Sequence, residues 1–326
     1  YHLIELYIEM LRRNGNLSYV NDILYKNERN LKYTYTPGLY YCKGLYYKYM
    51  GEINKALIEF SKAKADEEYG AKCLEQMVEI YINPDSDALL ITLDLPWHLR
   101  GETGLINYYT EGLNLEAILF LIRELKIRKD DYKIQIYESY AAIITKDEEK
   151  IESKLKEIKE LYKSNPDNIT ILFAYLLLNL VLKKIPDLKA QLDVFEKPAT
   201  NIKYFNDYER GYLLAAYVMM SSDNFKKASE YLKKVLKMNI GSVKAYEFIA
   251  LMKDKQGKYE ESCAYYEKAW EYSYKNNASV GYKLAIAYIN SKMHSRALNI
   301  CNEIRRKFPD YPIDEIALKA KNGLSS

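Results

Sequence analysis

The chain has 326 residues, of which 48% are hydrophobic and 29% are charged, so it is long and apolar enough to bury a substantial core. Its 48 basic and 45 acidic side chains give a net charge of +3, which provides no general attraction to nucleic acid or other polyanions. Only 13 Gly and 8 Pro punctuate the chain, too few for a typical all-β protein, and no stretch alternates convincingly as a strand would.

Neither a membrane-spanning segment nor a disulfide framework is predicted. The longest apolar run, residues 171–182, has twelve residues, whereas a helix needs about 20 to span a bilayer. The four cysteines are scattered without C-x-x-C spacing, which indicates reduced and buried thiols. Tyr1 stands inside an apolar periodic segment, so we expect the chain to be a piece of a longer protein.

The first part of the chain, residues 1–82, is typical of helical repeats. Apolar residues recur at helical spacing in LIELYIEML, residues 3–11. Residues 37–70 then form a complete unit with a turn at Gly51 between two helices. The small and aromatic residues of this unit, which are those needed at a close helix crossing, are Tyr40, Gly44, Tyr47, Ala56, Phe60 and Ala63.

Residues 83–110 break this pattern and predict an irregular loop or insertion. They carry Pro84, Pro96, Gly101 and Gly104, which do not continue a helix. Helical spacing of apolar residues then resumes in four segments, residues 114–126, 136–144, 151–162 and 171–182.

The C-terminal part repeats one unit three times, at residues 209–242, 243–276 and 278–311. A small residue recurs in the second helix at spacings of 34 and 35, and another recurs in the first helix at the same spacings. These residues are Ala228, Ser262 and Ala297 in the second helices, and Ala216, Ala250 and Ala285 in the first helices. This order and period are those of the tetratricopeptide (TPR) repeat, a pair of antiparallel helices.

The repeat pattern predicts both the fold and its organisation. Helix axes approach to about 8–10 Å only where side chains are small, and one hairpin cannot bury both of its faces, so units stack on one another. We therefore predict an all-α fold, an α-α superhelix of TPR type. It would comprise repeats in 1–82, the irregular segment 83–110, and repeats in 111–326 that end in a capping helix.

No constellation of residues predicts catalysis, metal binding or a cofactor. The carboxylates Glu260, Glu261, Glu267 and Glu271 recur along one second helix, where they are expected to be its solvated sides rather than an acid–base pair. The three histidines lie far apart, and neither a phosphate-binding glycine loop nor a nucleophile elbow is present. The sequence thus predicts a protein without enzymatic activity.

The inner face of the superhelix is the candidate binding surface. In TPR arrays it is lined mainly by the first helix of each pair, and the inward residues by spacing are Leu213, Tyr217, Met220, Glu247, Leu251, Tyr282 and Ile286. We expect this lining, largely apolar and aromatic, to accept a helix rather than a free carboxylate, which would need fixed cations. The basic clusters at 183–184, 233–237 and 305–307 lie late in helices, where cations complement the helix dipole, and are not expected to bind nucleic acid.

Several strings give the chain a specific resemblance. Residues 40–85 and 244–292 resemble the TPR subunit of intraflagellar transport complex A, the tetratricopeptide-repeat-21 family. The strings YCKGLY, INPD and VGYKLA stand in the family's order, followed by a Cys-led helix, FPDYP and a short basic helix. The resemblance covers nearly the whole chain and lapses at 83–110, while His294 and Ser295 replace a more usual basic-aromatic turn.

This resemblance implies a non-enzymatic scaffold subunit of the complex, serving retrograde transport and cargo trafficking in cilia. Its partners would be the other subunits, which combine WD40 propellers with TPR tails, together with ciliary cargo. It would reside in the cilium and the cytoplasm, associated with the cytoskeleton, and would neither enter a membrane nor bind nucleic acid. The alternative is a free-standing TPR adaptor that binds peptides, such as a co-chaperone.

Overall fold

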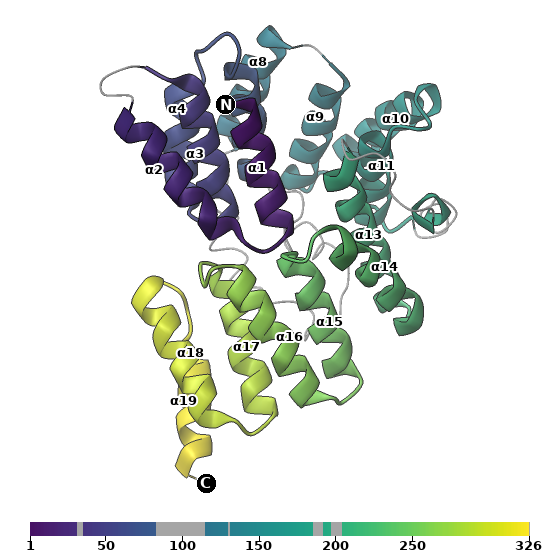
Figure 1. The fold of residues 1–326 in the computed structure, drawn as a ribbon. Helices are drawn as coiled ribbons and strands as arrows, with labels where there is room; N and C mark the ends of the chain where they lie inside the picture. The colour runs from purple at the N-terminus through teal and green to yellow at the C-terminus, as the bar shows by residue number, and fades with distance from the viewer. Residues whose placement is uncertain (31–34, 83–114, 130, 185–191, 197–203, 326) are drawn as a thin grey trace.

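The computed structural model is helical in every regular element that it describes, which confirms the predicted all-α class for those residues. The structure describes residues 1–30, 35–82, 115–129, 131–184, 192–196 and 204–325. The irregular segment predicted at 83–110 lies outside the described residues. Figure 1 shows the helices stacked side by side in a curved, solenoid-like array.

The helices follow one another as antiparallel neighbours. The N-terminal group comprises α1 (His2–Arg13), the 3₁₀ helix η1 (Leu17–Tyr19), α2 (Val20–Asn30), α3 (Pro37–Tyr49), α4 (Ile53–Ala63) and α5 (Gly70–Ile82). The middle group comprises α8 (Leu115–Arg128), α9 (Tyr132–Thr145), α10 (Glu148–Ser164), α11 (Ile169–Val181) and the 3₁₀ helix η2 (Leu192–Glu196). The C-terminal group comprises α13 (Phe205–Ser221), α14 (Phe225–Met238), α15 (Val243–Lys255), α16 (Tyr259–Tyr272), α17 (Ala278–Asn290), α18 (His294–Lys307) and α19 (Asp314–Ser325).

The four predicted repeat units coincide with four helix pairs. Units 37–70, 209–242, 243–276 and 278–311 correspond to α3 with α4, α13 with α14, α15 with α16, and α17 with α18, respectively, and α13 begins at Phe205, before the start of its predicted unit. These pairs have the most extensive contacts among the described helices. The sequence period thus located the hairpins from which the array is built.

Small residues allow the paired helices to cross closely. A Cβ atom added to Gly44 would lie 2.4 Å from the ring of Phe60 on the partner helix, a distance that no side chain could tolerate. The six small residues of the C-terminal units are completely buried, namely Ala216, Ala228, Ala250, Ser262, Ala285 and Ala297. These positions are small because the partner helix occupies the space that a larger side chain would need.

Side-chain caps mark where several of the helices begin. Asn or Asp occupies the N-cap position, and its side-chain oxygen accepts a backbone N–H from the first turn of the helix. These caps are Asp131, Asp147, Asn168, Asn224 and Asn277. Each cap satisfies a donor that the helix itself cannot pair, so the turns between helices are specified locally.

The buried side chains form two hydrophobic clusters that divide at α15. The first extends from Ile8 in α1 to Met252 in α15, and the second from Tyr246 to Ala320 in α19. The four cysteines are free and buried, as the sequence predicted. Burial raises the pKa of the Cys42 and Cys73 thiols to about 12 and that of the Cys301 thiol to about 11.

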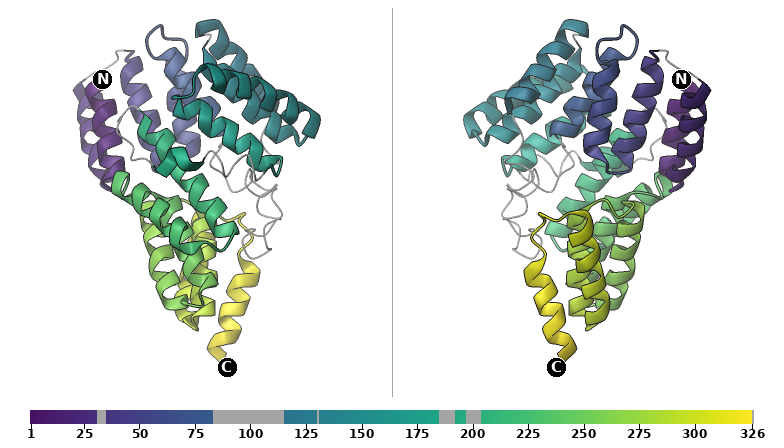
Figure 2. Two further views of the ribbon diagram at one scale, coloured as in Figure 1. Left: turned by 90° about the vertical axis from the view of Figure 1, so that its right-hand side faces the viewer. Right: turned by 90° about the vertical axis from the view of Figure 1, so that its left-hand side faces the viewer.

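The array curls so that its N-terminal helices approach the region from α13 to the end of α16. Figure 1 shows α15, α16 and α17 below the N-terminal helices α1 to α3, with the middle helices α9 to α11 on the right. In the two views of Figure 2 the molecule is broad at the N-terminal and middle helices and narrows towards α19. This curl brings residues more than 190 positions apart into contact, as in the pair of Arg12 and Asn206.

We predict that Ala228→Arg strongly destabilises the protein. Overpacking a core site costs about 1–3 kcal/mol, and the new charge adds to this cost because Ala228 is completely buried in the hydrophobic core. Urea denaturation should show the loss directly. Ala264→Arg is the matched control, because Ala264 lies on the exposed side of α16 and should tolerate the change. Equal stability of the two variants would show that the assigned crossing is wrong.

Candidate functional site

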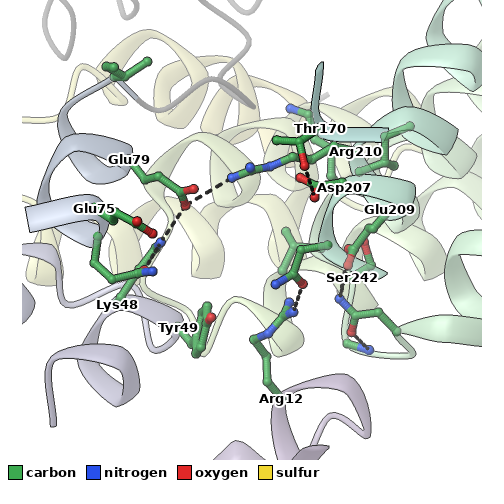
Figure 3. Close-up of a pocket in the computed structure, with 18 of the residues that line it drawn as sticks. Arg12, Lys48, Tyr49, Glu75, Glu79, Thr170, Asp207, Glu209, Arg210 and Ser242 are labelled. Carbon is green, nitrogen blue, oxygen red and sulfur yellow. Dashed lines mark hydrogen bonds and ion pairs between the residues drawn. The ribbon is translucent and has the colours of Figure 1, made fainter. Parts of the chain in front are cut away.

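A central cavity of about 530 Å³ lies where the N-terminal and C-terminal repeats face each other. Its walls come from α1, α3 and α5 on one side, from α9 and α11 in the middle, and from α13, α15 and the end of α16 on the other side. Figure 3 shows the charged side chains that project into it from these helices. The cavity is therefore a feature of the whole curl rather than of one repeat.

Two glutamates of α5 organise one wall. Glu79 Oε2 accepts a hydrogen bond from Lys48 Nζ of α3 and another from Arg210 of α13, each at 3.3 Å, and Figure 3 shows this chain of contacts crossing the cavity. Glu75 accepts from Lys133 of α9 at 2.8 Å. Burial by itself would raise the pKa of Glu79, but the charges of Arg210 and Lys48 outweigh it and lower that pKa to about 2.

The opposite wall is built around Arg12 at the end of α1. Its guanidinium pairs with Glu9 at 3.1 Å, donates to Asn206 Oδ1 at 2.8 Å, and lies 4.7 Å from the centre of the Tyr49 ring. The Tyr49 hydroxyl donates to Glu9, so Glu9 joins α1 to α3. Burial by itself would lower the pKa of Arg12, but the nearby carboxylates of Glu9 and Glu209 outweigh it and raise that pKa.

Two acidic residues of α13 complete the lining. Glu209 accepts from Asn239 Nδ2 at 2.9 and 3.0 Å and from the Ser242 hydroxyl at 2.8 Å. Asp207 accepts from the Thr170 hydroxyl at 2.7 Å, and burial raises its pKa above the ordinary value. The carboxylates thus tie α11 and the α14–α15 turn to α13.

The five Lys and Arg residues that line the cavity are all paired with carboxylates. Besides the pairs described above, Lys244 lies 3.6 Å from Glu247. A carboxylate at short range already neutralises each of these cations, which weakens its attraction for the terminal carboxylate of a peptide. The chemistry of the cavity is therefore that of a structural ion-pair network which joins successive repeats.

The N-terminal turns meet the region from α13 to the end of α16 along a line of contacts that we call the seam. On the N-terminal side it comprises residues 12–17 and 50–51, and on the C-terminal side Asn206, residues 239–241 and residues 272–276. Asn206 Oδ1 is an acceptor for both Arg12 and Arg13, at 2.8 and 2.6 Å. One amide oxygen thus holds two guanidinium groups at the start of α13.

Backbone groups also bond across the seam. The Ile240 N–H donates to the Arg13 carbonyl oxygen at 2.8 Å. The Leu17 N–H donates to the Tyr274 hydroxyl at 3.2 Å, and Asn276 Nδ2 donates to the Met50 carbonyl oxygen at 2.9 Å. Because carbonyls and amides at helix ends have no partner within the helix, the seam satisfies groups that would otherwise need water.

Glycines allow the close approach at the seam. A Cβ atom on Gly241 would lie 2.8 Å from the Arg12 carbonyl oxygen, and one on Gly15 would lie 2.5 Å from the Tyr272 ring. Gly15 also has a φ of +71°, which side chains disfavour. The seam therefore depends on backbone contact that larger residues would prevent.

The residues predicted to line one groove lie in different environments in the structure. Leu213 lines the cavity, whereas Tyr217, Met220 and Tyr282 are buried at 7%, 2% and 4% exposure within the repeat core. The remaining three differ in environment. Glu247 is buried and pairs with Lys283 of α17 at 2.8 Å, while Leu251 and Ile286 are half-buried. Their role in binding a partner remains a prediction.

The cavity is a different surface from the predicted groove, because of the seven predicted residues only Leu213 lines it. Its walls combine charged side chains with apolar and aromatic ones. Sequence spacing had identified Leu213 but not Lys48, Lys133 or Arg210, whose partners are far away in the sequence. The available signal was a pair of carboxylates, Glu75 and Glu79, four residues apart on a largely apolar helix. Such a pair at an inward position indicates that cations approach from other helices.

The basic clusters take part in local structure. Lys184 pairs with Glu152 at 3.0 Å, Lys234 donates to the Phe195 carbonyl oxygen at 3.0 Å, and Arg305 pairs with Asp314. In the part of the chain that the structure describes, no three His, Cys, Asp or Glu side chains gather as a metal site would require. Among the same residues, no helix combines the length and the apolar character needed to cross a membrane.

Two family models match the chain in sequence order. The model described as TT21 fifth ARM repeats domain matches residues 1–82, and the model described as Tetratricopeptide repeat protein 21 C-terminal ARM domain matches residues 117–321. The second match alone covers more than half of the chain. The seam lies between residues of these two matched segments.

Curated relatives match over almost the whole chain. Tetratricopeptide repeat protein 21B of Homo sapiens is 32% identical over 310 residues, which are 94% of this chain and 23% of the relative. The protein of the same name in Xenopus laevis is 31% identical over 318 residues, 96% of this chain and 24% of the relative. Tetratricopeptide repeat protein 21A of Homo sapiens is 28% identical over 331 residues, 97% of this chain and 24% of the relative. The chain spans about a quarter of the length of these relatives.

Solved repeat structures align with much of the chain at low similarity. The TPR2AB domain of yeast Sti1 in its complex with pHSP90 is 14% identical with a TM-score of 0.32, over 87% of this chain and 98% of that chain. The Cut9–Hcn1 hetero-tetramer of the APC/C gives 13% identity and a TM-score of 0.33, over 95% and 79% of the two chains. At such scores the family relationship rests on the sequence matches alone.

We predict that Gly241→Ala weakens the seam. The new Cβ atom would press on the Arg12 carbonyl oxygen, which belongs to the backbone and cannot rotate away, at a cost of about 1–3 kcal/mol. Thermal and urea denaturation would measure the loss. Gly257→Ala is the control, because nothing lies within 4 Å of its added Cβ atom and only its φ of +72° opposes the change. A Gly241→Ala variant as stable as wild type would contradict the close approach.

Acid should remove the stabilisation that Glu79 provides. Its folded pKa of about 2 lies below the ordinary value of 4.5, so the contribution is complete above pH 4.5 and is lost as the pH falls towards 2. Glu79→Gln should lower the free energy of unfolding at neutral pH on the order of 3 kcal/mol and flatten this part of the pH profile. Asp207 has a raised pKa, so its contribution to the free energy of unfolding is present at acid pH and is lost as the pH rises. This contribution is present in both wild type and Glu79→Gln. Urea titrations at several pH values test the difference, and parallel profiles would refute it.

Proposed function

This chain belongs to the tetratricopeptide repeat protein 21 family, and on that basis we propose that it is a non-enzymatic scaffold of intraflagellar transport complex A. In this role it supports retrograde transport and cargo trafficking in the cilium. The observation that carries the proposal is the family match itself, which runs in order through residues 1–82 and 117–321. The matched relatives are about four times longer, so the activity of the whole protein is part of the proposal.

The helical array supports a scaffold in physical terms. Stacked helix pairs give a long surface on which several partners can bind at once, and each repeat contacts mainly its neighbours. The partners proposed are the WD40–TPR subunits of the same complex and ciliary cargo, and the location is the cilium and the cytoplasm near the cytoskeleton. None of these partners would require chemistry from the charged cavity.

The paired charges of the cavity favour this role over that of a free-standing co-chaperone adaptor. Such an adaptor would hold a peptide carboxylate with cations, but Lys48, Lys133 and Arg210 are already bound to Glu75 or Glu79. A partner of this chain instead meets the half-buried apolar positions Leu251 and Ile286, which keep exposed surface on successive first helices. An apolar contact of this kind suits a helix of a neighbouring subunit.

We predict that Leu251→Ala/Ile286→Ala reduces the capture of complex A subunits from ciliated cells. Apolar anchors near the centre of an interface each contribute about 1–2 kcal/mol, so the affinity of the double variant should be lower by a factor of about 30 to 1,000. Affinity purification at physiological and at raised salt, with quantitation of co-purified subunits, provides the measurement. Apolar contacts should persist at raised salt, because salt mainly screens charges.

The matched control is Ile127→Ala/Leu318→Ala, which removes exposed apolar side chains from α8 and α19 instead. Thermal melts must show that both double variants are folded. Loss of capture by the control but not by Leu251→Ala/Ile286→Ala would place the contact on the outer helices. Capture of chaperones in place of complex A subunits would favour the adaptor.

A further inference from the structure

The seam differs from the rest of the protein in what holds it together. Within a repeat, apolar side chains at the helix crossing are completely buried, as Phe60 is in α4 and Ala228 is in α14. Across the seam, Leu17 is buried and Tyr274 packs against the core, and the two sides are joined by hydrogen bonds and by the close approach of glycines. These hydrogen bonds come from Arg12, Leu17 and Asn276. Hydrogen bonds within a protein replace hydrogen bonds to water, so separating such an interface costs less than exposing an apolar core.

One turn of the seam has a strained backbone. Tyr274 and Lys275, which follow α16, have φ values of +53° and +57° and are consecutive non-glycine residues in the left-handed region. The other described non-glycine residues with positive φ occur singly, at Lys146, Lys183, Asp223 and Lys292. The left-handed region is unfavourable for side-chain-bearing residues, so two in succession persist only where their surroundings hold them.

Contacts from two directions hold this turn. From the N-terminal side, the Leu17 N–H donates to the Tyr274 hydroxyl, and the Met50 carbonyl accepts from Asn276. From α18, Lys307 Nζ donates to the Lys275 carbonyl oxygen at 3.0 Å. The turn at 273–276 therefore links the first repeats to the last ones, and removing the N-terminal contacts leaves its strain uncompensated on that side.

We propose that the seam opens and closes as a unit within the folded protein, and that the 273–276 turn changes conformation when it opens. In the open state each helix pair keeps its buried crossing, while Arg12 and Asn206 exchange their mutual contact for water. Opening separates the N-terminal turns from the C-terminal repeats, widens access to the charged cavity and alters the curvature of the array. The closed seam and the open seam are thus two shapes of one scaffold.

Native-state hydrogen exchange tests the first part of this proposal on the full chain. The amides of Leu17 and Ile240 donate across the seam, so their exchange reports its opening. We expect both to exchange at least about tenfold faster than core amides of α11, with little dependence on low denaturant concentrations. Exchange of these two amides at the core rate, with the denaturant slope of global unfolding, would overturn the proposal.

A second arm tests whether the seam behaves as one unit. Asn276→Ala removes the bond to Met50 but touches neither reporter amide, and should accelerate exchange at Leu17 and Ile240 alike, by about fivefold. Asn302→Ala on the exposed side of α18 is the control. If Asn276→Ala leaves one or both reporters unchanged, the contacts open independently and no unit exists.

A third arm tests the strained turn. Lys275→Gly removes the strain of the left-handed backbone, which in this proposal exists only when the seam is closed. The closed state becomes more stable, so hydrogen exchange at Leu17 and Ile240 should slow by about fivefold. Lys292→Gly is the matched control, because Lys292 has a φ of +59° in the α17–α18 turn, away from the seam. Equal effects of the two variants on the reporters would show that the 273–276 turn keeps its conformation and would refute its proposed role.

Discussion

Two helices can cross closely only where the side chains between them are small, and the whole array depends on this constraint. Ala228, Ser262 and Ala297 are completely buried at their crossings and recur at almost constant spacing. Each crossing fixes one hairpin, and each hairpin leaves an apolar face that the next one covers. Repetition of nearly identical pairs then accumulates a curl, and the curl brings the N-terminal turns against the C-terminal repeats.

The sequence was sufficient to predict what is periodic. The four repeat units were located because the spacing of small and aromatic residues records the contacts between neighbouring helices. The inner surface was harder to predict, because spacing shows which residues share a helix face but not which neighbour covers that face. Tyr217 faces inward by spacing, yet the Phe248 ring lies 6.1 Å from it and it is buried. The seam had no periodic signal, since its partners, such as Leu17 and Tyr274, are 257 residues apart.

The charged cavity gives the helical-repeat scaffold a polar interior made of paired charges. The carboxylates of α5 and α13 are each held by donors from other helices, such as the Lys48 and Arg210 pair on Glu79. Removing Glu79 would take away the carboxylate that Lys48 and Arg210 share, so the network favours this one arrangement of the repeats. In the function proposed above, other proteins are recognised by surfaces that this network does not use.

The large sequence separation of the seam also has a consequence for how the chain folds. Helix pairs form from residues that are close in sequence and can assemble early. The hydrogen bonds of Arg13 with Ile240 and of Met50 with Asn276 can form only after the later repeats have been made. During synthesis the N-terminal turns therefore remain in solvent while the rest of the array is made. The Arg, Asn and Gly residues on the N-terminal side of the seam are well hydrated during this time. An apolar surface in the same place would promote aggregation of incomplete chains.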